Sequence, residues 1–101
     1  MSFEIENENG KCKVKGELTI YTANKFKDEI QKCVEGSDQI ELDLSAVDEI
    51  DTSCFQLLMQ AKKACDKSDK EFVLSKISPM VQDVMHLYSL DQFFEPQTRH
   101  V

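Results

Sequence analysis

The spacing of apolar residues changes repeatedly along this 101-residue chain, and the order of the changes restricts its fold. Alternation of apolar and polar residues, which is typical of half-buried strands, covers residues 3–20 and returns at 39–45. A short apolar run at 72–74 also indicates a strand, and the segments between have helical spacing. The predicted order is β-β-β-α-β-α-β-α. Its strand–helix–strand repeats imply parallel pairing, so we expect an α/β fold with a mixed sheet.

The first twenty residues are predicted to form a hairpin followed by a short third strand. Asn9-Gly10 indicates the hairpin turn because both residues tolerate positive φ. Gly16 allows a bend before the third strand. The apolar positions expected to face the core are Phe3, Ile5, Cys12, Val14, Leu18 and Ile20. Ile40, Leu42 and Leu44 mark one face of an inner strand later in the chain.

Three helices are predicted. Thr22 is the expected N-cap and Gly36 the expected stop of the first, and Ser78-Pro79 is expected to open the third. Their buried stripes should be Ala23, Phe26, Ile30, Cys33 and Val34 in the first, Cys54, Leu57, Leu58, Ala61 and Cys65 in the second (residues 52–66), and Val81, Val84, Met85 and Tyr88 in the third. Leu90, Phe93 and Phe94 are expected to close the core, and residues 97–101 to form a loose tail.

Composition favours a cytoplasmic protein with a protein partner. The net charge is −7, from 12 basic and 19 acidic residues, and Arg99 is the single arginine. This charge disfavours binding to nucleic acid or to anionic lipid, because both require neutralisation of phosphates. No apolar run is long enough for membrane insertion, and residues 1–6 do not resemble a signal peptide. The length suits a single domain, residues 1–101.

The sequence predicts no enzyme, no cofactor and no metal site. The four cysteines form no C-x-x-C pair, so we expect reduced, mostly buried thiols. With three glycines in the chain, neither a phosphate-binding loop nor a dinucleotide fingerprint is present. No sequence motif marks His86 as a catalytic histidine, and the acidic groups along the chain are most simply explained as solvent-exposed surface residues.

Residues 51–54, Asp51-Thr52-Ser53-Cys54, are the candidate functional site. They follow a predicted inner strand and begin the clearest amphipathic helix. Asp51 or Thr52 can cap that helix by accepting a hydrogen bond from a free backbone N–H. A helix N-terminus can also receive an added phosphate, because its free N–H groups and positive dipole end favour an anion.

Five segments resemble the STAS family, the anti-sigma factor antagonist fold, in order and spacing. Residues 16–23 resemble its G-E-L-D-x-x-T-A entry to the first helix, and residues 42–47 its L-D-L-S-x-V strand. Residues 50–54 resemble its I-D-S-S-G phosphorylation turn. Ser78-Pro79 and residues 87–90 are similar to the S-P-x-V and L-x-G-L parts of the last helix. The resemblance covers about residues 16–94.

This resemblance implies a four- to five-stranded mixed sheet with three to four helices packed mainly on one face. It also implies a bacterial binding module, a monomer or weak dimer, whose partner is a serine kinase that is also an anti-sigma factor. The kinase phosphorylates the serine before the family glycine, which releases the partner, and a phosphatase restores binding. By position that serine is Ser53, with Asp51 and Thr52 shaping the turn. The expected partner face also includes Thr19, Asp48 and Cys54.

Two positions depart from the family pattern. Cys54 replaces the glycine, and Thr19 replaces an acidic residue near the expected partner face. Other STAS proteins suggest alternatives. Some belong to chemotaxis clusters, and others resemble accessory subunits of phospholipid ABC transporters, which bind the ATPase and carry D-T before the second helix, as Asp51-Thr52 does here. A small-ligand module without a switch is a third possibility.

Overall fold

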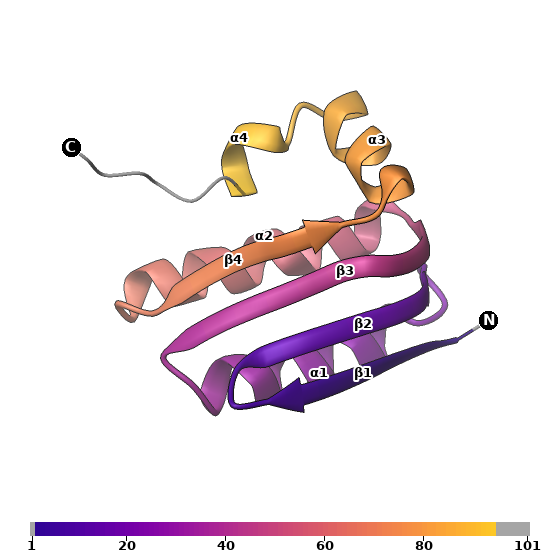
Figure 1. Ribbon diagram of the computed structural model, residues 1–101. Helices are drawn as coiled ribbons and strands as arrows, with labels where there is room; N and C mark the ends of the chain where they lie inside the picture. The colour runs from indigo at the N-terminus through magenta and orange to yellow at the C-terminus, as the bar shows by residue number, and fades with distance from the viewer. Residues whose placement is uncertain (1, 95–101) are drawn as a thin grey trace.

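The computed structural model describes residues 2–94 and arranges them as one mixed sheet with four helices (Figure 1). Residues 97–101, for which a loose tail was predicted, lie outside the described residues. The strands are β1 (Phe3–Glu8), β2 (Lys11–Leu18), β3 (Gln39–Ile50) and β4 (Glu71–Ile77). The helices are α1 (Ala23–Glu35), α2 (Thr52–Lys67), α3 (Pro79–Leu87) and α4 (Asp91–Phe94).

The sheet has the strand order β1-β2-β3-β4, with β1 antiparallel to β2 and the other pairs parallel. This confirms the mixed sheet and the hairpin, whose turn residues Asn9 and Gly10 have φ values of 54° and 91°. The predicted third strand is wrong. Gly16, at φ 108°, takes up the bend inside β2 at an irregularity in the β2–β3 register, so the ladder continues to Leu18. Ile20 lies beyond the sheet and is exposed.

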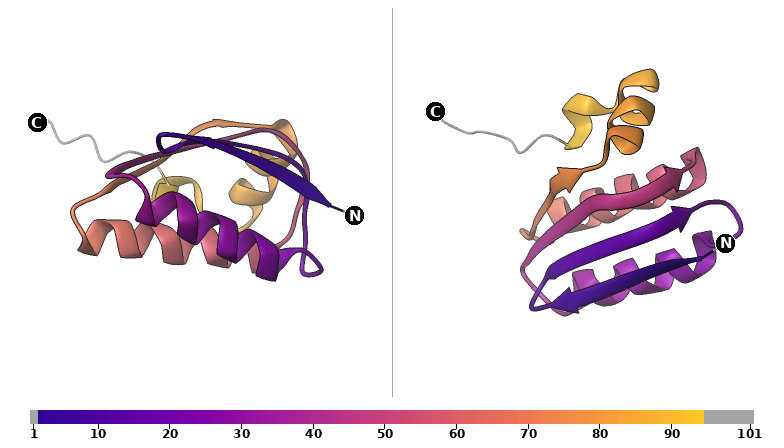
Figure 2. Two further views of the ribbon diagram at one scale, coloured as in Figure 1. Left: turned by 90° about the horizontal axis from the view of Figure 1, so that it is seen from below. Right: turned by 45° about the vertical axis from the view of Figure 1, so that its right-hand side comes forward.

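Helices α1 and α2 cover the same face of the sheet (Figure 2). The alternating residues of the strands supply one side of the core and the helical stripes supply the other, as predicted from their spacing. Phe3 packs edge-on against Phe26, with ring centroids 5.6 Å apart. The largest fully buried side chains are Phe26, Phe55, Leu18, Ile40, Leu42, Leu44, Leu58, Val14, Val47, Val81, Cys12 and Cys33.

Helix α3 begins as predicted and ends earlier than its apolar pattern suggested. Ser78 is the N-cap and accepts a hydrogen bond from the backbone N–H of Val81 at 3.2 Å, with Pro79 in the first turn. The prediction that Tyr88 is buried is wrong, since its side chain is 51% exposed. The helix stops at Leu87 and Ser89 has positive φ, so Tyr88 leaves the buried stripe. Phe94 is buried and Leu90 and Phe93 pack against the core, as expected.

Parallel pairing of β2 and β3 determines where the candidate site lies. Leu18 and Ile50, the last residues of the two strands, are paired in the register. The segments that follow these strands are residues 19–22 and residues 51–54. They therefore start side by side at one end of the sheet, where the parallel strands finish. Strand β3 reaches this end because it runs to Ile50, five residues beyond the segment expected from its alternation.

Candidate functional site

Asp51 links the two segments at this end of the sheet through both its backbone and its side chain. Its backbone N–H donates to the carbonyl of Leu18 at 3.0 Å. As N-cap of α2, it accepts hydrogen bonds at Oδ1 from the backbone N–H of Ser53 (3.1 Å) and from Ser53 Oγ (2.5 Å). Its Oδ2 accepts from the backbone N–H of Ile20 at 2.8 Å. One carboxylate thus caps the helix and holds the loop that precedes α1.

Residues 19–22 form a compact turn held by two buried threonines. Thr22 Oγ1 accepts from the backbone N–H of Thr19 at 3.0 Å, and the Thr22 N–H donates to the Thr19 carbonyl at 3.0 Å. Thr19 Oγ1 accepts from the backbone N–H of Tyr21 at 3.3 Å. Thr22 is the N-cap of α1 as predicted, although its side chain makes no capping bond to that helix. Thr19 is predicted to lie at the partner face, but in the structure it makes its hydrogen bonds within the turn.

Cys54 faces inward from the first turn of α2. Its side chain is fully buried, and its Sγ donates to the carbonyl of Thr19 at 3.6 Å. Burial raises the pKa of the Cys54 thiol to about 11, so it is a neutral packing group at pH 7. The position of the family glycine therefore accommodates a side chain here, and the thiol adds a second contact between α2 and residues 19–22.

The predicted site residues differ in how accessible they are. Ser53 is partly buried with its hydroxyl bonded to Asp51, whereas Thr52 and Asp48 are exposed. Asp48 belongs to the last part of β3 rather than to the turn. The sequence reasoning missed the exposed apolar residues of the neighbouring loop, Ile20 (66%) and Tyr21 (84%). Their signal was present: Ile20 continues the strand alternation, but Tyr21 breaks it directly before the expected helix cap at Thr22.

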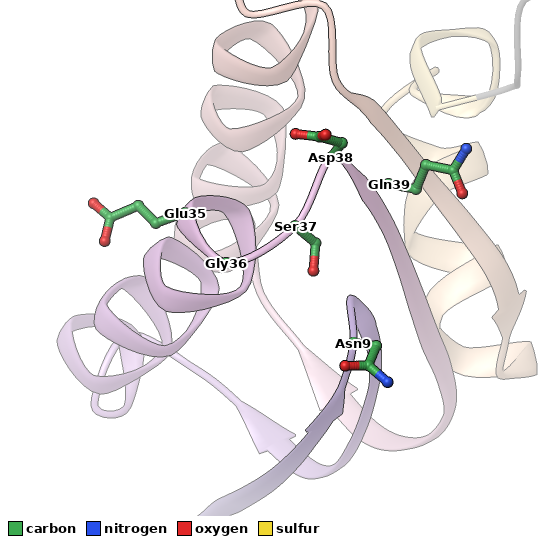
Figure 3. A pocket seen from close by; sticks show the side chains of 6 residues that line it. All are labelled: Asn9, Glu35, Gly36, Ser37, Asp38 and Gln39. Carbon is green, nitrogen blue, oxygen red and sulfur yellow. The ribbon is translucent and has the colours of Figure 1, made fainter.

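A hollow of about 580 Å³ lies at the other end of the sheet, between the β1–β2 hairpin and the α1–β3 loop. Its lining is Asn9, Glu35, Gly36, Ser37, Asp38 and Gln39. Figure 3 shows the Glu35 side chain directed away from Ser37 and Asn9, so its carboxylate does not join a shared centre with them. Across residues 2–94, no group of three or more histidine, cysteine or acidic side chains could hold a metal ion. No helix in the same residues is long and apolar enough to cross a membrane.

Several solved structures share the fold. Bacillus SpoIIAA, an anti-sigma factor antagonist, is 16% identical in both its unphosphorylated and phosphorylated forms, with TM-scores of 0.72 and 0.67. Each form aligns with 97% of this chain, over 90% and 93% of SpoIIAA. An anti-sigma factor antagonist from Mycobacterium paratuberculosis is 24% identical over 92% of this chain and 81% of its own, with a TM-score of 0.77.

A sulfate transporter family protein from Wolinella succinogenes has the same fold at 16% identity. It aligns with 84% of this chain and 70% of its own length, with a TM-score of 0.68. Similarity at these identities concerns the fold and leaves function open. The family assignment comes from the sequence model described as Mlab, STAS domain, which matches residues 1–96. The chain therefore belongs to this family of STAS domains, in agreement with its predicted resemblance.

Proposed function

We propose that this protein is a cytoplasmic regulatory binding module of the anti-sigma factor antagonist type, switched by phosphorylation of Ser53. Its partner would be a serine kinase that is also an anti-sigma factor, or a related signalling protein. One observation carries the proposal: the Ser53 hydroxyl lies in the first turn of α2, next to a loop that exposes Ile20 and Tyr21. These two exposed apolar side chains beside the hydroxyl support a partner-contact surface next to the proposed phosphorylation site.

The hydrogen bond between Ser53 and Asp51 suits phosphoryl transfer. The hydroxyl proton of Ser53 points to Asp51 Oδ1, so the carboxylate can accept it as Oγ attacks the γ-phosphorus of the nucleotide held by the kinase. The Oγ–P bond forms, the bond between the γ-phosphorus and the bridging oxygen breaks to release the nucleoside diphosphate, and Asp51 passes the proton on to solvent. Afterwards that hydrogen bond is lost, and a phosphate of about −1.5 to −2 charges lies against the Asp51 carboxylate.

The added charge would act on the contact surface. The dipole and N–H groups of α2 favour the phosphate, while Asp51 repels it, so the phosphate is expected to turn outward toward the partner. Exposed Asp48 and Glu49 add to the negative charge at the end of β3. A differential cost of about 1–3 kcal/mol changes partner affinity by about 5–150-fold, which is enough to exchange partners.

Ser53→Asp is expected to weaken partner capture about 5–150-fold, whereas Ser53→Ala should capture the partner at least as well as the natural protein. Ser68→Asp is the matched control, because it adds the same charge at the exposed far end of α2. Pull-downs from native cells with the three variants measure capture, and peptide mapping of the protein from those cells measures phosphate on Ser53. A stoichiometric partner that binds all variants equally, with unmodified Ser53, would refute the switch.

Tyr21→Ala is expected to reduce partner affinity about 30-fold, because an exposed tyrosine at the centre of an interface contributes about 2 kcal/mol. Stability should hardly change, since the Tyr21 side chain is 84% exposed. Tyr88→Ala removes the other, half-exposed tyrosine and is the control. Titration calorimetry with the captured partner measures both. Equal affinities for the two variants would show that the interface does not include residues 19–22.

The second candidate is an accessory subunit of a phospholipid ABC transporter that binds the ATPase. Two observations favour it: the family model carries the Mlab description, and the Asp51-Thr52 pair forms the N-cap and first residue of α2. Here Asp51 and the loop would form a constitutive docking surface, and the Ser53 hydroxyl would serve only the cap. The same pull-down separates the two functions. A membrane-associated ATPase captured equally by Ser53→Asp and Ser53→Ala would support the transporter subunit.

A further inference from the structure

Two cysteines that are distant in sequence meet in the core at the end of the sheet opposite Ser53. Cys12 is the second residue of β2, and Cys33 lies in the last turn of α1. Their sulfur atoms are 2.6 Å apart, and each side chain is only 1% exposed. Both point into the space between the sheet and α1. The other two cysteines, Cys54 and Cys65, are also buried but lie in α2.

The contact makes the two thiols chemically different. Cys12 S–H donates to Cys33 Sγ, and this hydrogen bond holds the pKa of the Cys33 thiol below its ordinary value despite burial. The same hydrogen bond raises the pKa of Cys12. By contrast, burial raises the pKa of both Cys54 and Cys65. Since the thiolate is the reactive form, Cys33 is the expected nucleophile and Cys12 the partner that can resolve its oxidised form.

We propose that Cys12 and Cys33 are a site of reversible oxidation, where a peroxide converts the thiol pair into an intramolecular disulfide joining β2 to α1. In the first step the Cys33 thiolate attacks one oxygen of hydrogen peroxide and the O–O bond breaks, which forms the sulfenic acid and releases hydroxide. The hydroxide takes up the proton that the Cys33 thiol lost on ionisation and becomes the first water. In the second, Cys12 sulfur attacks Cys33 sulfur, the S–O bond breaks, and water leaves with the Cys12 proton. Overall, two thiols and one peroxide give one disulfide and two water molecules.

The position of the pair favours this chemistry. Cys33 is three residues from Gly36, where α1 ends, and the last turn of a helix opens locally at low cost. Hydrogen peroxide is small enough to reach the sulfur through such an opening. The disulfide would close a ring over residues 12–33, which includes residues 19–22 beside Ser53. By restricting the unfolded chain, this ring should raise the melting temperature by about 15 °C.

The test is peroxide treatment of the full chain at equimolar concentration, followed by unfolding, alkylation and peptide mapping. Two of the four thiols should be lost, with Cys12 and Cys33 joined and with Cys54 and Cys65 alkylated. Dithiothreitol should return all four. If all four thiols were alkylated after treatment, the proposal would be overturned. Cys12 and Cys33 would then be two thiols that only pack together in the core. A disulfide between other cysteines, or sulfinic acid on Cys33 without a bond to Cys12, would overturn it too.

Variants add a second readout. Cys33→Ser should abolish both the disulfide and the rise in melting temperature, whereas Cys65→Ser, which also removes a buried thiol, should keep both. If Cys33→Ser does not fold, the peptide map of the natural chain alone decides. Because Ser53 takes no part, the outcome is independent of the proposed phosphorylation switch.

Discussion

Asp51→Ala is expected to lower the free energy of unfolding by about 3 kcal/mol, measured by urea denaturation followed by circular dichroism. The substitution removes the acceptor for two backbone N–H groups, those of Ser53 and Ile20, together with the partner of the Ser53 hydroxyl. Loss of an N-cap costs about 1 kcal/mol, and a hydrogen bond to a charged acceptor contributes about 1.5–3 kcal/mol. The domain should retain its fold with a lower denaturation midpoint.

Two further variants separate the contributions of Asp51. Ser53→Ala removes only the hydroxyl donor, so it should cost no more than about 1 kcal/mol. Asp51→Asn should be intermediate, because its amide oxygen can accept one of the two N–H groups while its NH₂ group faces the other. If Asp51→Ala were no more destabilising than Ser53→Ala, the bond to Ile20 would contribute nothing and the loop would be held by other contacts.

The Asp51 turn shows what local sequence can predict and what it cannot. A capping residue before an apolar stripe at helical spacing predicts both the start of α2 and the burial of Cys54, and the structure has both. The bond from Asp51 to the N–H of Ile20 depends on the pairing of Leu18 with Ile50, which the sequence does not reveal. The proximity of Cys12 to Cys33 depends in the same way on how α1 lies across β2.

The wrong predictions occur where a periodic pattern continues past the end of its element. Ile20 continues the alternation of β2, but the chain has already turned, because Thr22 holds the N–H of Thr19. Tyr88 continues the stripe of α3, but the helix ends one residue before it. Element ends are set by caps, turns and packing rather than by the period itself. Ile20 and Tyr88, which continue these patterns past the ends of their elements, are therefore exposed apolar side chains.

Gly10→Ala is expected to destabilise the protein by about 3 kcal/mol, or about 15 °C in melting temperature, because both the backbone angle and the available space exclude a side chain. Gly10 has φ 91°, which L residues rarely adopt. A Cβ atom there would also lie 2.2 Å from the carbonyl oxygen of Gln39, with Ser37 Oγ at 2.9 Å. Gly10 itself accepts a hydrogen bond from the N–H of Glu41 at 2.8 Å, so the hairpin cannot move away without disturbing β3.

Gly36→Ala is the matched control for Gly10→Ala, because Gly36 lines the hollow beside the β1–β2 hairpin (Figure 3), has a negative φ, and would give an added Cβ no contact under 3.0 Å. Gly36 ends α1 as predicted, but with φ −88° rather than a left-handed conformation. Its added Cβ would meet only the Lys32 carbonyl oxygen, at 3.3 Å, so stability should change by no more than about 0.5 kcal/mol. Equal stabilities of the two variants in thermal and urea unfolding would mean that the hairpin yields at Gly10. In that case, the close approach of the β1–β2 turn to β3 would not be what fixes the β2–β3 register. That register brings Leu18 beside Ile50 and Asp51 beside Ile20.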